Sequence, residues 1–332
     1  MSVKWGIVGT ADIATKVSKA IQRAKNAELL AIGSRSSERA EKWAMEHGAS
    51  RSYGSYEALL DDPDVAAVYI PLPPSMHSEW GIKAAKAGKH VLSEKPLTMD
   101  IGEAVALEAA CSERGVQLMD GVMWVHHDRS AEVKQVIQAG ELGPLRRVTA
   151  CFAFKWGEKI PTDNIRAQEE LGGGSLGDTG YYCIRAILWA FGELPKSVYA
   201  RSRYANNVDI ETSAMLYFSD DRTASFDCGF TMNFRAWLEL VGADASMVFD
   251  EFVLPESESE SFYYLRKERG SREQYRIGPC VQEVKMIERF SNIVETGEID
   301  TTLIKDALDT VRVCSAVASS ARTGRIVEVN PA

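Results

Sequence analysis

The fold is indicated first by the stretch Trp5-Gly6-Ile7-Val8-Gly9-Thr10-Ala11-Asp12-Ile13-Ala14. A short apolar run ends at a glycine, and apolar residues then recur at helical spacing through Val17 and Ile21. The turn between them has the spacing of the dinucleotide fingerprint G-x-G-x-x-G, with alanine at its second and third glycine positions. A strand, a tight turn and a helix are therefore expected, and the helix start is a candidate phosphate site.

Strand and helix signals go on alternating as far as residue 120. Nearly unbroken apolar runs at 29–32, 65–70, 90–92 and 116–119 predict strands, and the segments between several of them predict helices. Such strands are typical of a parallel sheet with helices on both faces. The first domain is therefore expected to be a doubly wound α/β domain over residues 1–121.

The pattern changes after residue 121. Strand-like segments follow one another between 197 and 254 with short joints, which requires a largely antiparallel sheet. The tract Glu256-Ser257-Glu258-Ser259-Glu260-Ser261 predicts a solvated loop, and two helices close the chain. We therefore expect residues 122–332 to form an α+β domain with a large, mainly antiparallel sheet.

Composition narrows the class of protein. The 332 residues are 45% hydrophobic and 26% charged, an ordinary globular balance, and 38 Lys and Arg against 47 Asp and Glu give a net charge of -9. So acidic a chain favours neither nucleic acid nor an anionic membrane as partner. No apolar run approaches the roughly 20 residues that span a bilayer, and no signal peptide precedes the first strand. With six scattered cysteines and no C-x-x-C, a soluble cytoplasmic protein with reduced thiols is expected.

The end of the second predicted strand bears on the choice of cofactor. NAD-binding domains place Asp or Glu there to hold the ribose 2′-hydroxyl. This chain has Gly33-Ser34-Arg35-Ser36-Ser37-Glu38-Arg39, with arginines and serines where the acid is expected. Guanidinium groups suit a 2′-phosphate, so NADP is favoured over NAD. The alternative is that Arg35 and Arg39 are solvated charges at a helix start.

A second motif follows the strand at 90–92. Ser93-Glu94-Lys95-Pro96 lies at the carboxyl end of a predicted parallel strand, where open sheets bind ligands. A partly desolvated lysine there is able to exchange a proton with a substrate hydroxyl. The alternative is a Glu–Lys pair on a surface turn.

These motifs together resemble the Gfo/Idh/MocA oxidoreductases. The resemblance covers essentially the whole chain, and its most specific feature is Glu-Lys-Pro followed later by Gly-Gly-Gly and Asp-x-Gly-x-Tyr. The matching segments are Gly9–Ala14, Pro73-Pro74-Ser75-Met76-His77, Gly88-Lys89-His90-Val91-Leu92-Ser93-Glu94-Lys95-Pro96 and Gly172-Gly173-Gly174-Ser175-Leu176-Gly177-Asp178-Thr179-Gly180-Tyr181-Tyr182. The chain looks most like a branch near dimeric dihydrodiol dehydrogenase and NADP-dependent xylose dehydrogenase. The resemblance implies an N-terminal Rossmann domain that binds NADP and a second domain for substrate binding and oligomerisation.

The resemblance also implies roles for single residues. Lys95 matches the catalytic lysine, Asp178 would orient substrate and lysine, and Tyr182 would act as acid/base or hydroxyl anchor. Leu72 and Pro73 would wall the nicotinamide pocket. The residues expected to hold the cofactor are Gly9, Thr10, Ala11, Asp12, Ile13, Ser34, Arg35, Arg39, Leu72, Pro73, His77, Glu94, Lys95 and Pro96.

Some positions leave alternatives open. Asp178 could cap the following helix, and Tyr182 could be a core aromatic with Tyr181 in its place at the site. His127 keeps a histidine of the family pattern while a neighbouring arginine is lost, and it is expected to contact substrate, as is Arg166. Asn164 and Arg166 would reach substrate hydroxyls or form a surface ion pair. No metal site is expected, because the adjacent residues His126 and His127 have no evident further ligands, and adjacent histidines rarely converge on one ion without them.

The motifs predict an NADP-dependent oxidoreductase, and the resemblance implies that it acts on a sugar or similar small polyhydroxylated substrate. Hydride would pass between nicotinamide and a carbinol or carbonyl carbon, with Lys95 and Tyr182 handling the proton. A trans-dihydrodiol dehydrogenase and a non-catalytic NADP-sensing regulator are the alternatives. The outer face of the second sheet needs a cover, and the resemblance implies that a second subunit provides it, so a homo-oligomer, in the first place a homodimer, is expected.

Overall fold

The computed structural model describes residues 2–156, 162–255 and 259–330, and the chain divides into two compact units. The first unit comprises Met1–Met123 and Gln282–Leu308, and the second comprises Trp124–Val281 and Asp309–Ala332. The sequence-based division placed the boundary after residue 121, whereas it lies after Met123, and it assigned Gln282–Leu308 to the second domain. The physical reason is a shared core, described below.

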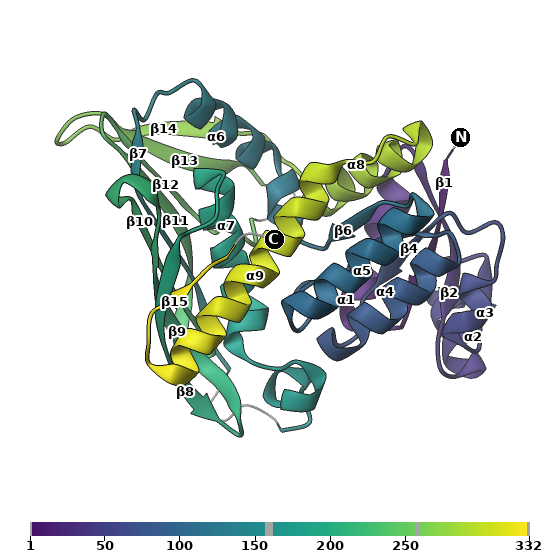
Figure 1. Ribbon diagram of the computed structural model, residues 1–332. Helices are drawn as coiled ribbons and strands as arrows, with labels where there is room; N and C mark the ends of the chain where they lie inside the picture. The colour runs from purple at the N-terminus through teal and green to yellow at the C-terminus, as the bar shows by residue number, and fades with distance from the viewer. Residues whose placement is uncertain (1, 157–161, 256–258, 331–332) are drawn as a thin grey trace. The chain divides into compact units, whose positions relative to one another are not determined.

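The first unit is built on a parallel sheet with strand order β3-β2-β1-β4-β5-β6 (Figure 1). All of its described neighbouring pairs are parallel, as predicted. The chain reverses its direction of travel across the sheet between β1 and β4, and open sheets bind ligands at such a switch point. Its strands are β1 Val3–Val8, β2 Ala27–Gly33, β3 Arg51–Tyr53, β4 Ala67–Ile70, β5 His90–Ser93 and β6 Leu118–Asp120.

Local capping explains where several helices of this unit begin and end. Ser36 and Ser55 accept hydrogen bonds from backbone amides in the first turns of α2 and α3. Gly48 and Gly115 follow α2 and α5 in the left-handed conformation that favours glycine. The helices are α1 Asp12–Arg23, α2 Ser37–His47, α3 Tyr56–Leu60, α4 His77–Lys86, α5 Ile101–Arg114, α8 Gln282–Thr296 and the first part of α9 Thr301–Thr323.

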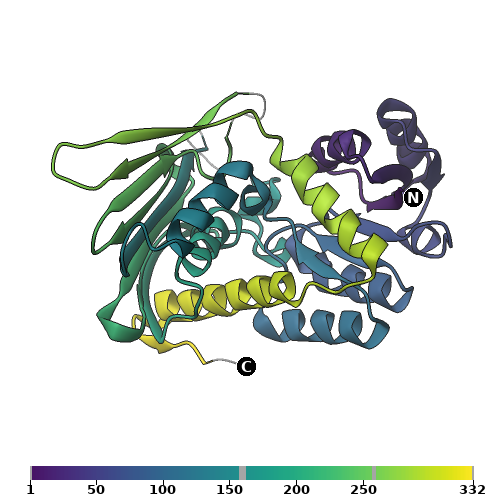
Figure 2. The ribbon, with the colours of Figure 1, turned by 90° about the horizontal axis from the view of Figure 1, so that it is seen from above.

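Helix α8 belongs to the first unit because it completes the core on one face of the sheet. Ile287 and Phe290 join a buried cluster that includes Trp5 and Ile21. The Trp5 and Phe290 ring centroids are 5.1 Å apart, and Trp5 Nε1 donates to Ser291 Oγ at 3.0 Å. Helices α1 and α8 thus cover one face, while α4 and α5 lie on the other (Figure 2).

The second unit is built on a sheet with strand order β14-β13-β12-β11-β7-β10-β9-β8-β15. Among the described strands, β10 and β7 pair parallel and the other neighbouring pairs are antiparallel, which confirms the predicted mainly antiparallel sheet. Its elements are α6 Asp128–Gln138, β7 Leu145–Lys155, α7 Tyr181–Phe191, β8 Ser197–Ala205, β9 Val208–Tyr217, β10 Thr223–Gly229, β11 Thr231–Gly242, β12 Ser246–Asp250, β13 Ser261–Arg266, β14 Glu273–Ile277, the rest of α9, and β15 Val327–Glu328.

The predicted loop at 256–261 is partly corrected. Residues 256–258 lie outside the described residues, but Ser261 is buried and begins β13. Its neighbours alternate between the buried core and a more exposed face, with Tyr263 and Leu265 almost fully buried. The predicted loop therefore extends one residue too far, because Ser261 follows the charged tract directly but already belongs to the strand.

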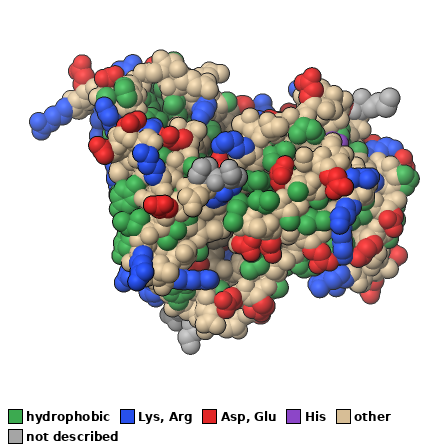
Figure 3. All heavy atoms as spheres, in the orientation of Figure 1, with side chains coloured by type: hydrophobic (Ala, Val, Ile, Leu, Met, Phe, Trp, Pro, Cys, Tyr) green, Lys and Arg blue, Asp and Glu red, His purple; other side chains and the backbone are tan. Residues whose placement is uncertain are grey.

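Burial alternates strictly along β9, where every second residue from Val208 to Leu216 is buried. The same alternation holds in β10 as far as Cys228. One face of this sheet is therefore core, and the other is partly exposed. On the side of the molecule shown in Figure 3, acidic and basic side chains are interspersed over the surface. Among the described residues, the helices include none long and apolar enough to cross a membrane.

Candidate active site

The turn after β1 is shaped so that only glycine fits at its first position. Gly9 has φ of +115°, and its amide donates to Gly33 O at 2.9 Å. A Cβ at this residue would lie 2.8 Å from Cδ2 of Leu72, closer than real Cβ contacts come. The β1–α1 turn therefore packs directly beneath Leu72, which follows β4.

The start of α1 offers backbone amides to a ligand. Its N-cap residue, Ala11, provides no side-chain hydrogen bond to the helix. Ala14 is fully buried, so a small residue there lets the helix approach the sheet. Gly9, Thr10, Ala11, Asp12 and Ile13 thus form a turn and helix start of the kind that binds phosphate groups.

The end of β2 lacks a carboxylate and carries exposed arginines. Ser34 is buried, and its amide donates to Tyr53 O at 3.0 Å. Arg35 and Arg39 are exposed, and neither forms an ion pair with any residue in the described part of the chain. Both guanidinium groups are therefore available to an anion.

The turn after β5 is held by a buried carboxyl group. Glu94 Oε1 accepts from Tyr69 Oη at 2.7 Å, and Glu94 Oε2 accepts from the Lys95 amide at 3.1 Å. Burial raises the pKa of Glu94, against the charge of Lys95 and the Tyr69 hydrogen bond. Gly121 makes room for this group, since a Cβ there would lie 2.9 Å from Glu94 Oε1.

Lys95 itself is partly exposed, and the Lys95–Pro96 bond is cis. His77, the first residue of α4, is fully buried beneath this turn. Its Nδ1 lies 2.8 Å from Pro96 O and its Nε2 lies 2.7 Å from Leu72 O. Burial lowers the pKa of His77, while the backbone carbonyls favour the protonated ring. Both ring nitrogens therefore face the protein's own backbone.

In the second unit, Asp178 is paired with Arg166. Arg166 Nε donates to Asp178 Oδ2 at 2.6 Å, and the guanidinium lies 5.1 Å from the Trp156 ring centroid. Asn164 caps this turn by accepting from the Arg166 amide. A Cβ at Gly173 would lie 2.7 Å from Arg166 O, so the glycine run closes directly against the arginine's backbone.

The helix that follows corrects one alternative. Asp178 lies in a π-helical turn over Leu176–Gly180, and α7 begins after its N-cap Gly180 without a side-chain cap. Asp178 therefore does not cap α7. Tyr181 is fully buried, whereas Tyr182 is partly exposed, with its ring centroid 5.7 Å from that of Phe152. Of the two tyrosines, Tyr182 is the one with access to solvent.

His127 has a structural contact that the sequence did not suggest. Its ring is 1% exposed, and Nδ1 accepts from the Arg129 amide at 2.9 Å, which caps α6. Because the His127 ring is buried, a substrate would have to reach into the protein to contact it, and the predicted contact between His127 and substrate stays a prediction.

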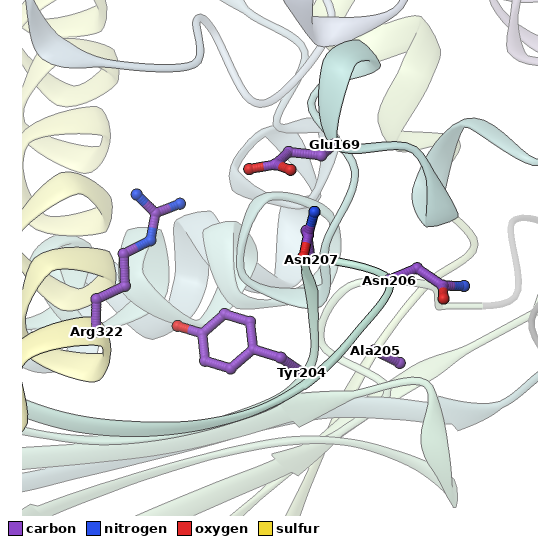
Figure 4. A pocket seen from close by; sticks show the side chains of 6 residues that line it. All are labelled: Glu169, Tyr204, Ala205, Asn206, Asn207 and Arg322. Atoms are coloured by element: carbon purple, nitrogen blue, oxygen red, sulfur yellow. The ribbon is translucent and has the colours of Figure 1, made fainter.

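A pocket of about 470 Å³ lies elsewhere in the second unit. Tyr204 and the turn after β8 form one side, and Glu169 and Arg322 form the others (Figure 4). None of the residues predicted to carry the chemistry lines it.

Comparisons with known proteins show the family of this chain. A family model described as "Oxidoreductase family, NAD-binding Rossmann fold" matches residues 3–122, and the GFO/IDH/MocA C-terminal domain matches residues 130–248. The chain belongs to the Gfo/Idh/MocA oxidoreductase family. The resemblance inferred from the motifs is confirmed, and so is the expectation of an enzyme of the dehydrogenase and reductase class.

Three similar proteins show the range of the family near this chain. D-xylose 1-dehydrogenase (NADP(+)) 2 of Haloferax volcanii is 35% identical over 98% of this chain and 99% of its own. A 3-ketoreductase from Actinomadura kijaniata, solved with NADP and TDP-benzene, is 31% identical with a TM-score of 0.89, over 96% of this chain and 98% of its own. It has also been solved with one lysine or one tyrosine replaced. Trans-1,2-dihydrobenzene-1,2-diol dehydrogenase of Sus scrofa is 28% identical over 94% of this chain and 96% of its own.

Sequence reasoning missed two residues that shape the site. Tyr69 supports Glu94 from within β4, and a tyrosine in an otherwise apolar buried strand was a usable signal, because its hydroxyl needs a partner. Gly121 gave no signal, because its neighbour Glu94 is distant in sequence.

Proposed function

We propose that this protein is an NADP-dependent oxidoreductase that transfers a hydride between nicotinamide and a carbinol or carbonyl carbon of a sugar or sugar derivative. The observation that carries the proposal is the tight turn between β1 and α1, residues Gly9 to Ile13, here called the cradle. A Cβ on Gly9 of this turn would collide with Leu72. A tight strand–helix turn of this kind leaves the backbone amides at the start of α1 for a pyrophosphate. Among the relatives, the xylose dehydrogenase is named for NADP and the ketoreductase was solved with it.

NADP rather than NAD is supported by the end of β2. Ser34 occupies the position where a carboxylate would contact a 2′-hydroxyl, and the guanidinium groups of Arg35 and Arg39 are exposed nearby in sequence. Gly9, Thr10, Ala11, Asp12 and Ile13 would hold the pyrophosphate, and Leu72, Pro73 and Pro96 would wall the nicotinamide. When bound, the cofactor supplies or accepts the hydride.

The chain's own residues would handle the proton. Lys95 is proposed to exchange a proton with the substrate oxygen, and Tyr182 to act as acid/base or to anchor a hydroxyl. Asp178 would orient the substrate. The Arg166 ion pair fixes the orientation of the Asp178 carboxylate.

A sugar-like substrate is proposed from two relatives that are named for sugars. They differ in charge, since one is named for D-xylose and the other for a dTDP-linked sugar. The dihydrodiol dehydrogenase similarity keeps aromatic trans-diols as the second candidate. A substrate panel should therefore contain neutral sugars, nucleotide-linked keto sugars and trans-diols.

The function is tested by following NADPH absorbance with that panel for wild type, Lys95→Ala and Tyr182→Phe. We expect turnover with a sugar-type substrate, and a loss of about 100-fold or more in kcat for Lys95→Ala with NADP binding retained. Turnover with diols alone would replace the substrate proposal. NADP binding without turnover on any substrate would favour a sensing regulator, and full activity in Lys95→Ala would refute the assignment of the lysine.

Cofactor choice is tested separately with Arg35→Asp combined with Arg39→Ala. Lost guanidinium–phosphate contacts should raise the KM for NADP by about 10- to 100-fold and leave that for NAD nearly unchanged. The matched control is Arg114→Ala, which removes an exposed arginine from the last turn of α5. Equal effects on NADP and NAD would contradict the 2′-phosphate assignment.

We also propose a homodimer that covers the partly exposed face of the second unit's sheet. This face carries Met215 and Tyr217 on β9, and Tyr217 is 36% exposed. Light scattering at micromolar concentration should give twice the mass of one chain, and Met215→Asp should shift the mass toward one chain. A monomeric mass for wild type would refute the dimer.

A further inference from the structure

His77 is bound on both sides by the backbone of two different turns. Its Nε2 lies 2.7 Å from Leu72 O in the turn after β4, and its Nδ1 lies 2.8 Å from Pro96 O in the turn after β5. The residue is fully buried. Carbonyl oxygens only accept, so the ring donates to one of them when neutral and to both when protonated.

The two turns that His77 joins carry the proposed site. Leu72 lies over Gly9 of the β1–α1 turn, and Pro96 follows Lys95 directly. The imidazole thus links the turns at the carboxyl ends of adjacent strands β4 and β5, and through Leu72 it reaches the turn after β1. Because the ring is inside the protein, it acts on the site through the backbone.

We propose that His77 is a positioning residue, which fixes the Lys95–Pro96 turn against the turn that carries Leu72 and so sets where the Lys95 side chain starts. The catalytic part of this inference rests on the proposed role of Lys95. The tie between the two turns stands on its own geometry and is tested without turnover. A displacement of about 1 Å at a catalytic group is enough to cost about 100-fold in rate.

The chain provides a matched control in His90. This histidine begins β5, at the opposite end of that strand from Lys95, and its Nδ1 accepts from the Gln117 amide at 3.0 Å. His90→Leu therefore removes a histidine–backbone hydrogen bond from the same unit without touching the two turns. His77→Leu removes both contacts, and His77→Gln keeps one donor of similar reach.

The first test is amide hydrogen exchange on the cofactor-free protein. In His77→Leu, peptides covering 72–76 and 94–99 should exchange about 10-fold faster than in wild type, while the remainder of the first unit is unchanged. His77→Gln should show a smaller increase, and His90→Leu should show none in these peptides. Exchange that rises uniformly over the unit, or that stays at the wild-type rate in both turns, would overturn the proposal.

The second test is steady-state kinetics with the substrate found in the panel. For His77→Leu we expect kcat to fall by about 10- to 100-fold while the KM for NADP changes by less than about 3-fold, with His77→Gln intermediate. A wild-type kcat in His77→Leu, or an equal fall in His90→Leu, would refute the positioning role. If His77→Leu does not fold, His77→Gln decides alone, by whether kcat and local exchange change together.

These outcomes separate His77 from the proposed function. Full activity in Lys95→Ala would refute the catalytic role of the lysine, while the exchange result would still establish or refute the tie between the turns. Loss of activity in Lys95→Ala with normal activity in His77→Leu would uphold the function and refute the role of His77.

Discussion

Replacing Gly9 by alanine should damage the first unit in two separable ways. The backbone at φ +115° is one that L side chains rarely adopt, and such strain costs about 1–3 kcal/mol. The new Cβ would also lie 2.8 Å from Leu72 Cδ2, well inside the roughly 3.5–4.0 Å of an ordinary carbon contact. Overpacking of this kind costs about 1–3 kcal/mol, so Gly9→Ala should lower the free energy of unfolding by about 2–6 kcal/mol.

The two contributions can be measured by urea unfolding of single and double variants. Gly88→Ala is the control, because Gly88 has φ of +75° and nothing within 4 Å of its added Cβ, so it should cost only the backbone strain, about 1–2 kcal/mol. In Gly9→Ala with Leu72→Ala the collision is relieved, so the double variant should be more stable than the sum of the single effects predicts.

The same variants report on the cofactor. An alanine methyl in the cradle should weaken NADPH binding, measured by fluorescence titration, by about 10-fold or more. Gly88→Ala should bind as wild type. Wild-type NADPH affinity in Gly9→Ala, or a loss of stability no larger than that of Gly88→Ala, would refute the reasoning from this cradle.

Three further variants test contacts elsewhere in the fold. Burial opposes ionisation of Asp62, but hydrogen bonds from Arg51 and Tyr53 outweigh this effect and lower the pKa of Asp62. The wild-type protein should therefore lose stability as pH falls below about 4. In urea unfolding, the stability of Asp62→Asn should depend less on pH in this range, and equal slopes for the two proteins would contradict the reasoning. Ser320→Ala removes a buried hydroxyl that accepts from a strand amide and donates to a carbonyl, and should cost about 1–3 kcal/mol in urea unfolding with NADPH affinity unchanged. Both carboxyl oxygens of Glu94 accept hydrogen bonds, from Tyr69 Oη and from the Lys95 amide. Glu94→Gln replaces one of these acceptors by an amide donor and should lower both the melting temperature and kcat. An unchanged kcat would count against the role of this carboxyl group.

Much of the first unit could be predicted because its signals are local. Serine caps, glycine stops and apolar runs act over a few residues, as Ser36, Ser55 and Gly48 do in the structure. Strand β3 was missed because Arg51–Tyr53 is too short for any alternation to register. The packing of α8 against Trp5 was missed because it joins segments at opposite ends of the sequence.

In the candidate site, too, the local motifs could be predicted and the long-range contacts could not. Gly9 and Lys95 lie in short motifs whose spacing carries the chemistry, so their positions at the ends of β1 and β5 were predictable. The contacts that hold these turns were not, since His77 reaches carbonyls whose positions depend on the folded chain. The pairing of Arg166 with Asp178 was foreseen only as an unspecified ion pair.

The first unit is assembled from two separate lengths of chain, and this has a consequence for biosynthesis. While the ribosome is still translating the second unit, the nascent N-terminal sheet has one hydrophobic surface without its covering helix, and the indole of Trp5 lacks its acceptor 286 positions downstream. Native stability of this half is therefore reached only when translation is nearly finished. Polypeptides truncated near residue 123 should consequently depend on chaperones and aggregate when released.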